Sequence, residues 1–152
     1  MENSSARHMW GDFLDAHLQY AFVDPPKVLH FCNTELEANR STALVLDQIK
    51  KATTYSLLGL QHRKESLPKI GSFMVITNWE GKAQCIVRTT AVQLKPFYSI
   101  TKDFALKEAI GDHSLETWKK ATWERFSEEL KPFNKVPKES MIVVCQEFEK
   151  VF

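Results

Sequence analysis

The stretch from Thr34 to Leu57 constrains the fold of this chain most, because it opens with a strong helix-capping signal and ends in a cluster of lysines and threonines. Thr34 and Glu37 match a capping box, in which a hydroxyl and a carboxylate three residues apart satisfy exposed amide donors. Apolar residues then recur at helical spacing. The stretch therefore predicts a capped helix with one buried face.

The lysines at the end of this stretch allow two interpretations. In the first, Lys50 and Lys51 stand in the last helical turn, where the macrodipole favours cations and the final carbonyls accept their hydrogen bonds. In the second, Lys50 and Thr53 project together into a cleft as a base and a hydroxyl. The spacing favours the first interpretation and leaves the second open.

Composition limits the classes of function. The chain has 152 residues, a length that predicts one domain. Its formal net charge of +1 predicts no strong electrostatic field that would attract polyanions. Its three widely spaced cysteines fit buried thiols in a reducing compartment better than a disulfide framework or a zinc site. No apolar run reaches the length of a membrane span, and the N-terminus lacks the pattern of a signal peptide. We therefore expect a single-domain, cytoplasmic protein.

The rest of the chain mixes helical and strand patterns without an internal repeat. Helical spacing predicts helices over about residues 5–22, 102–110 and 115–130, the last capped by Ser114. Strand composition predicts strands over about residues 55–60, 73–77, 82–94 and 141–148. The last strand is apolar on both faces in its first half, which predicts a central position in a sheet.

Only isolated polar residues remain as candidates for chemistry, since glycine-rich phosphate loops, GxSxG elbows and HExxH motifs are absent. Arg88 fits either a rim arginine with a buried stem or a contact to a substrate anion. Residues 112–114 are most simply a polar turn and a cap. Glu108 is a surface charge unless apolar neighbours raise its pKa. Lys50, Thr53 and Glu108 together would make a set that hydrolyses amides without a metal.

Four segments, taken in their order and spacing, resemble the ASCH domain family. They are ANRSTALVLDQIKKATTYSL, LPKIGSFMVITNWEGKAQCIVRTTAV, PFYSITKDFALKEAIGDHSLETWKKATWERF and MIVVCQEFEKVF. The resemblance runs from about Leu29 to the C-terminus. It implies an α+β fold with a PUA-like β-barrel flanked by helices, so that residues 1–152 form a single domain with a helical N-terminal extension over about residues 1–28.

The resemblance also implies roles for individual residues. The family's GxKxxT cluster falls on Gln48, Lys50 and Thr53, and its acidic segment begins at Glu108. The family is similar to bacterial amidohydrolases that remove the acetyl group from N4-acetylcytidine. By that similarity Lys50 is the base, Thr53 the nucleophile and Glu108 the proton donor. A register that pairs Lys51 with Thr54 is the alternative.

The chain departs from the family pattern at a few positions. Gln48 and Ile110 stand where relatives carry glycine and an acidic residue. Thr122 stands where they carry histidine, and Arg125 where they carry an aromatic residue.

The resulting hypothesis is an amidohydrolase, without metal or other cofactor, that acts on an acylated pyrimidine nucleoside such as N4-acetylcytidine. The alternatives are a non-catalytic RNA- or nucleotide-binding module and a ribonuclease, so the expected partner is a nucleoside or RNA and not a membrane. The near-neutral charge favours a small ligand over extended RNA. The predicted substrate contacts are Lys51, Arg88, Asp112, Trp118 and Thr122. The oligomeric state stays open.

Overall fold

The structure, a computed structural model, describes all residues from 1 to 152, which form two compact units. Unit 1 comprises Met1–Ile49, Ile70–Thr90 and Phe148–Phe152, and unit 2 comprises Lys50–Lys69 and Ala91–Glu147. None of the helices combines the length and apolar character that crossing a membrane requires.

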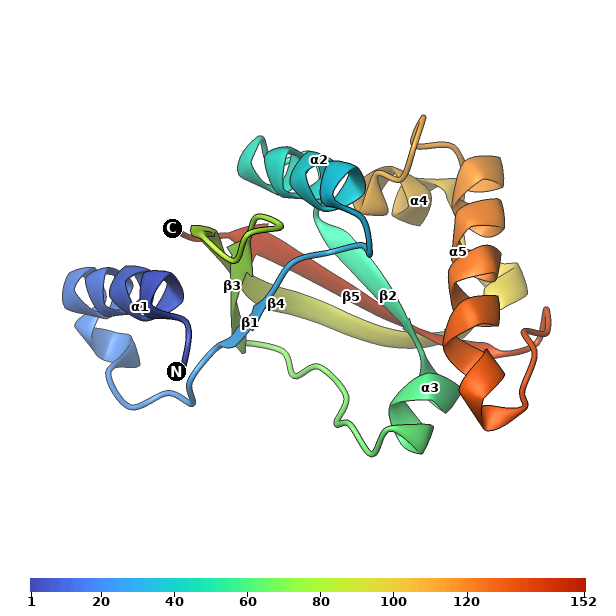
Figure 1. Ribbon diagram of the computed structural model, residues 1–152, viewed down its shortest axis with the longest axis horizontal. Coiled ribbons are helices and arrows are strands. Elements are labelled where there is room, and N and C mark those ends of the chain that lie inside the picture. The colour runs from blue at the N-terminus through green and yellow to red at the C-terminus, as the bar shows by residue number, and fades with distance from the viewer. The chain divides into compact units, whose positions relative to one another are not determined.

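Five strands form one sheet in the hydrogen-bonded order β1-β3-β4-β5-β2 (Figure 1). The strands are β1 (Lys27–Leu29), β2 (Ala52–Ser56), β3 (Phe73–Thr77), β4 (Ala83–Pro96) and β5 (Ile142–Lys150). β1 pairs with β3 in parallel, whereas the pairs β3–β4 and β2–β5 are antiparallel. The interior place of β5 confirms the predicted central strand. The expected α+β fold, a PUA-like β-barrel flanked by helices, is confirmed in the form of a curled five-stranded sheet flanked by helices.

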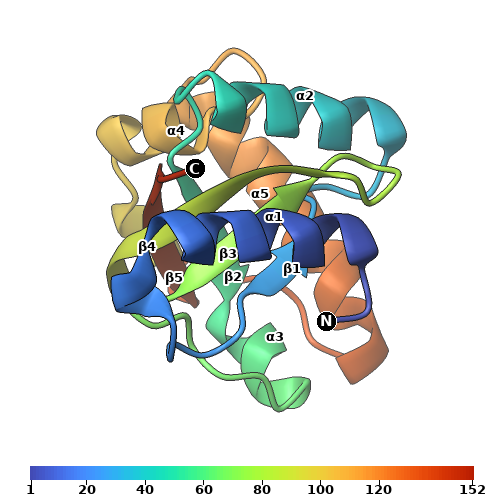
Figure 2. The same cartoon turned by 90° about the vertical axis from the view of Figure 1, so that its left-hand side faces the viewer.

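In unit 1, helix α1 (Ser4–Ala16) packs aromatic side chains on β3 and β4 (Figure 2). Trp10 and Phe13 are buried with Phe73 in one apolar cluster. The helix nevertheless stops at Ala16, and only a short 3-10 turn (Leu18–Tyr20) follows it. The prediction of one helix to residue 22 is therefore wrong, and Phe22 is fully exposed.

Helix α2 (Glu35–Leu46) of unit 1 begins as its sequence predicts and ends earlier. The Thr34 hydroxyl accepts a hydrogen bond from the Glu37 amide at 3.3 Å. At the other end Gln48 has a φ of 59°, its amide donates to the Val45 carbonyl, and the Ile49 amide donates to the Leu44 carbonyl. These two bonds form a Schellman motif, which terminates the helix. The interpretation of the two lysines as the last turn of this helix is therefore wrong.

In unit 2, strand β2 is followed directly by helix α3 (Leu57–His62). The Ser56 hydroxyl caps this helix by accepting a hydrogen bond from the Gly59 amide at 3.0 Å. The predicted strand over residues 55–60 is wrong beyond Ser56, because this cap turns the apolar run Leu57–Leu60 into a helix.

Helices α4 (Lys102–Glu108) and α5 (Leu115–Leu130) complete unit 2 with two 3-10 turns, Phe97–Ser99 and Lys131–Phe133. The bounds of α5 and its Ser114 cap confirm the prediction. Its apolar side chains pack with those of β5 in one cluster that includes Trp118, Phe126, Val143 and Cys145. Cys85 and Cys145 are buried as expected, whereas Cys32 is exposed.

The Schellman motif predicts an effect of changing Gln48. A left-handed backbone costs a non-glycine residue about 1–2 kcal/mol, and glycine avoids that cost. We expect Gln48→Gly to raise the free energy of unfolding by about 1 kcal/mol, measured by urea denaturation. Gln48→Ala is the control, since it removes the same polar side chain without relieving the backbone. Equal stability of the glycine and alanine variants would contradict the argument.

Candidate functional site

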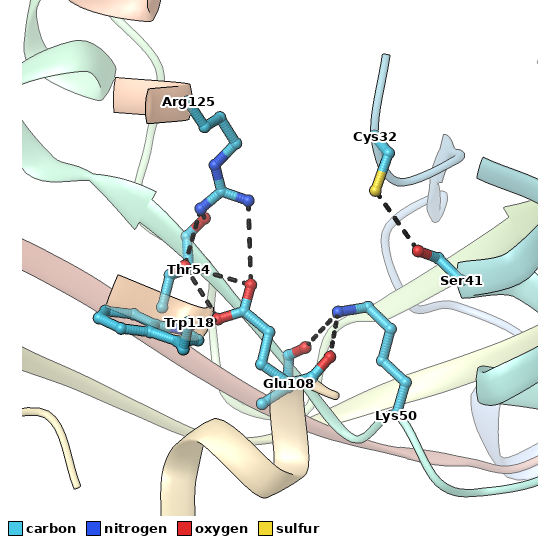
Figure 3. A network of polar contacts seen from close by, with 8 residues as sticks. Cys32, Ser41, Lys50, Thr54, Glu108, Trp118 and Arg125 are labelled. Atoms are coloured by element: carbon cyan, nitrogen blue, oxygen red, sulfur yellow. Dashed lines mark hydrogen bonds and ion pairs between the residues drawn. The ribbon is translucent and has the colours of Figure 1, made fainter. Parts of the chain in front are cut away.

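A network of buried polar groups surrounds the Glu108 carboxylate in unit 2 (Figure 3). Glu108 is the last residue of α4 and is 1% exposed. Its Oε1 accepts hydrogen bonds from Thr54 Oγ1 at 3.0 Å and from Trp118 Nε1 at 2.7 Å. Its Oε2 lies 3.8 Å from NH1 of Arg125. Three elements, β2, α4 and α5, therefore meet at one carboxylate.

The end of α4 fixes the position of Glu108. Ala109, which follows it, has the left-handed backbone angles φ 59° and ψ 47°, and its amide donates to the Ala105 carbonyl at 3.0 Å. The carbonyls of the last turn, which have no partner within the helix, receive donors from the segment that leads into β2. The Lys51 amide donates to the Lys107 carbonyl at 2.7 Å, and Lys50 Nζ donates to the Glu108 carbonyl at 3.0 Å.

Lys50 is buried, with 5% of its surface exposed, and its Nζ also donates to the Ala52 carbonyl at 2.9 Å. A cation at a helix C-terminus is favoured by the macrodipole. Lys50 thus has the carbonyl-capping role of the first interpretation, at the end of α4 and not of α2. The same contacts bring its ammonium to the residue that carries the buried carboxylate.

The two threonines of β2 face opposite ways, because side chains alternate along a strand. Thr54 pairs with Cys145 of β5 and faces the cluster that contains Trp118. Thr53 pairs with Gln146 and is buried on the other face. The structure therefore brings Lys50, Glu108 and Thr54 into one network, while the side chain of Thr53 lies outside it. The nucleophile role of Thr53 stays a prediction.

Arg125 of α5 is a member of the network that the sequence did not reveal as a site residue. Its NH2 donates to the Thr54 carbonyl at 3.0 Å and to Thr54 Oγ1 at 2.8 Å. Its guanidinium also lies 5.1 Å from the centre of the Phe126 ring. Arg125 is seven residues after Trp118, which places both on one face of α5. That spacing, with the alternation of side chains along β2, is the sequence signal from which this grouping could have been found.

Burial alters the acidity of two neighbours of the network. It raises the pKa of Tyr55 to about 12, against the opposing effect of the Arg125 charge. It also raises the pKa of the Cys145 thiol to about 12, and the Glu108 charge adds to that rise. Both groups therefore stay protonated at neutral pH.

The predicted contacts Lys51 and Asp112 belong to unit 2 and are both exposed. Asp112 stands in the turn before α5, where its carboxylate accepts a hydrogen bond from the Ser114 amide at 2.9 Å. Hydrogen bonds from the Ser114 side chain and backbone lower the pKa of Asp112 to about 2. This geometry agrees with the simpler interpretation of Asp112 as part of a polar turn and cap.

Arg88 belongs to unit 1 and has its own set of partners there. Its Nε donates to the Gly71 carbonyl at 3.3 Å, and its NH1 donates to the Tyr20 hydroxyl at 3.2 Å. The guanidinium also lies 5.2 and 5.3 Å from the ring centres of Tyr20 and Phe73. These contacts correspond to the interpretation of Arg88 as an arginine packed within its unit.

Thr122 lies on α5 between Trp118 and Arg125 and is 1% exposed. Its Oγ1 is buried and has no hydrogen-bond partner in the structure. A ligand cannot reach this oxygen in the present conformation, so the predicted substrate contact of Thr122 stays a prediction.

Comparisons with known proteins agree with this fold. The model of the ASCH domain family matches residues 27–152, so the chain belongs to that family. The chain is similar to a crystal structure of an ASCH domain from Lactobacillus crispatus JV V101, with 27% identity over 96% of this chain and 93% of that one, and a TM-score of 0.91. It is also similar to the protein EF3133 from Enterococcus faecalis V583, with 31% identity over 97% and 88% of the two chains and a TM-score of 0.86. Among curated proteins there is no match.

The unpartnered hydroxyl predicts a gain in stability when it is removed. Valine has nearly the same shape as threonine, and a buried hydroxyl without a partner costs about 1–3 kcal/mol. We expect Thr122→Val to raise the free energy of unfolding by about 1 kcal/mol, measured by urea denaturation. Thr122→Ser, which keeps the hydroxyl and loses the methyl group, should lower it. A valine variant less stable than the parent would show that the hydroxyl has a partner in solution.

Proposed function

We propose that this ASCH domain protein is an amidohydrolase that removes the acyl group from an acylated pyrimidine nucleoside of the N4-acetylcytidine type. The observation that carries the proposal is the buried Glu108 carboxylate, which is hydrogen-bonded to a threonine hydroxyl and joined through its own main chain to Lys50. The resemblance of the segments around Lys50 and Glu108 to amidohydrolases supports it.

Hydrolysis of an amide needs a nucleophile, a group that takes the nucleophile's proton, and a donor that protonates the leaving amine. One carboxyl group can do the last two tasks, because it can accept the proton of the nucleophile and then donate that proton to the leaving amine. Glu108 lies within hydrogen-bond reach of a hydroxyl, which is the geometry that this exchange requires. Lys50, predicted as the base, contacts the main-chain carbonyl of the same residue.

The binding-module alternative uses the same residues differently. Lys50 and Lys51 would then contact phosphates, and affinity for RNA would fall steeply with salt. The burial of Lys50 and the near-neutral net charge favour the small ligand over a phosphate backbone.

The proposal predicts a large loss of activity on changing Glu108. Glutamine keeps the size of the side chain and removes the charge that accepts the proton, so Glu108→Gln should lower kcat/KM for N4-acetylcytidine by about 100-fold or more. Release of cytidine, followed by chromatography with purified protein, is the measurement. The matched control is Glu124→Gln, an exposed carboxylate on α5, which should leave turnover unchanged.

Two results would contradict the proposal. One is the absence of turnover by the folded parent protein, after which salt titration against single-stranded RNA tests the binding module. The other is full activity of the Glu108→Gln variant.

A further inference from the structure

We propose that Thr54 is the nucleophile of this site, with Glu108 as the base that takes its proton. This inference rests on the proposed amidohydrolase function. Its starting point is the direction of the hydrogen bonds at Thr54 Oγ1, which lies 2.8 Å from NH2 of Arg125 and 3.0 Å from Oε1 of Glu108.

The chemistry of the partners fixes that direction. A guanidinium only donates hydrogen bonds, so Arg125 occupies one lone pair of the Thr54 oxygen. An ionised carboxylate only accepts them, so the single hydroxyl proton of Thr54 points at Glu108. One lone pair remains on the Thr54 oxygen, and it is the pair that attacks.

The base is itself held in place by a third group. Trp118 Nε1 donates to Glu108 Oε1 at 2.7 Å, and Trp118 is fully buried. A weak hydroxyl nucleophile is activated when it is hydrogen-bonded to a base and a third group holds that base in its orientation. Thr54, Glu108 and Trp118 have that arrangement, with Trp118 as a positioning residue. Thr53 lies on the other face of β2 and faces away from Glu108.

The reaction balances without any further reagent. Thr54 Oγ1 bonds to the acyl carbon while its proton passes to Glu108, and the carbonyl oxygen becomes an anion. The C–N bond then breaks as Glu108 gives the proton to the amine of the pyrimidine. A water molecule then loses a proton to Glu108 and bonds to the acyl carbon. The bond between that carbon and Thr54 Oγ1 breaks, the acyl group leaves as the carboxylic acid, and Glu108 returns the proton to Thr54 Oγ1.

Arg125 explains how a buried hydroxyl is reached. Thr54 is 3% exposed, whereas the Arg125 side chain is 37% exposed, so Arg125 is the member of the network that meets solvent. Its NH2 donates to Thr54, and its NH1 lies 3.8 Å from Glu108 Oε2. Arg125 covers the Thr54 oxygen through this hydrogen bond, so a shift of its side chain would give a substrate access to that oxygen, with guanidinium N–H groups close to the oxygen anion that forms there.

The test compares two variants of Thr54 in the full chain with N4-acetylcytidine as the probe. Thr54→Val keeps the shape and removes the hydroxyl, and it should lower kcat/KM by about 100-fold or more. Thr54→Ser keeps the hydroxyl and should stay within about 10-fold of the parent. Thermal melting verifies that each variant is folded. Loss of activity in the serine variant equal to that in the valine variant would overturn the inference, as would turnover by the valine variant at the parental rate.

A second measurement does not depend on the folding of a variant. The parent enzyme is mixed with substrate, quenched in acid within one turnover and digested, and the peptide that contains β2 is sequenced by mass spectrometry. An acetyl group on Thr54 is the expected result. An acetyl group on Thr53 would overturn this inference and leave the proposed function intact, whereas absence of turnover by the parent would remove both.

Discussion

The burial of one ionisable carboxylate, that of Glu108, is the constraint on which unit 2 depends. Moving a carboxylate out of water costs several kcal/mol unless donors replace the lost hydration. The donors come from β2 and α5, through Thr54, Trp118 and the nearby Arg125. Removing one of these donors would leave the buried carboxylate with fewer hydrogen bonds than its desolvation requires, at about 1–3 kcal/mol. The carboxylate therefore fixes two elements that lie far apart in the sequence against the end of α4.

Lys50 and Lys51 show that the rule for helix C-termini holds at the end of a helix that the sequence does not identify. Cations at helix C-termini satisfy carbonyls, and the Lys50 ammonium does so, while Lys51 donates to a neighbouring carbonyl through its main-chain amide. Their target is α4, which begins about fifty residues later in the chain. Spacing along the chain indicates which residues share a helix. It does not indicate which helix C-terminus lies next to a given side chain in the folded protein.

The fold could be predicted where local sequence signals were strong. The site could be predicted only where tertiary contacts did not override those local signals. Ser114 and Thr34 cap their helices as the sequence indicates, and β3 and β4 form where strand composition predicts strands. Leu57 to Leu60 carry a strand-like apolar run, yet the Ser56 cap makes them helical. Arg125 was missed because its partner, Thr54, is reached only through the packing of α5 on unit 2's strands.

Backbone strain next to the site also limits how a Lys50 variant can be interpreted. Ala109 holds a left-handed conformation that costs alanine about 1–2 kcal/mol, and such a conformation persists only where surrounding contacts impose it. The bond from Lys50 Nζ to the Glu108 carbonyl is one of those contacts. Without it, the turn relaxes and the carboxylate moves away from Thr54, so activity would fall even if Lys50 never accepted a proton. A positioning role leaves the pH dependence of the residual rate unchanged, whereas a base role removes an ionisation from that dependence. The shape of the pH profile, and not the size of the loss, therefore separates the two roles of Lys50.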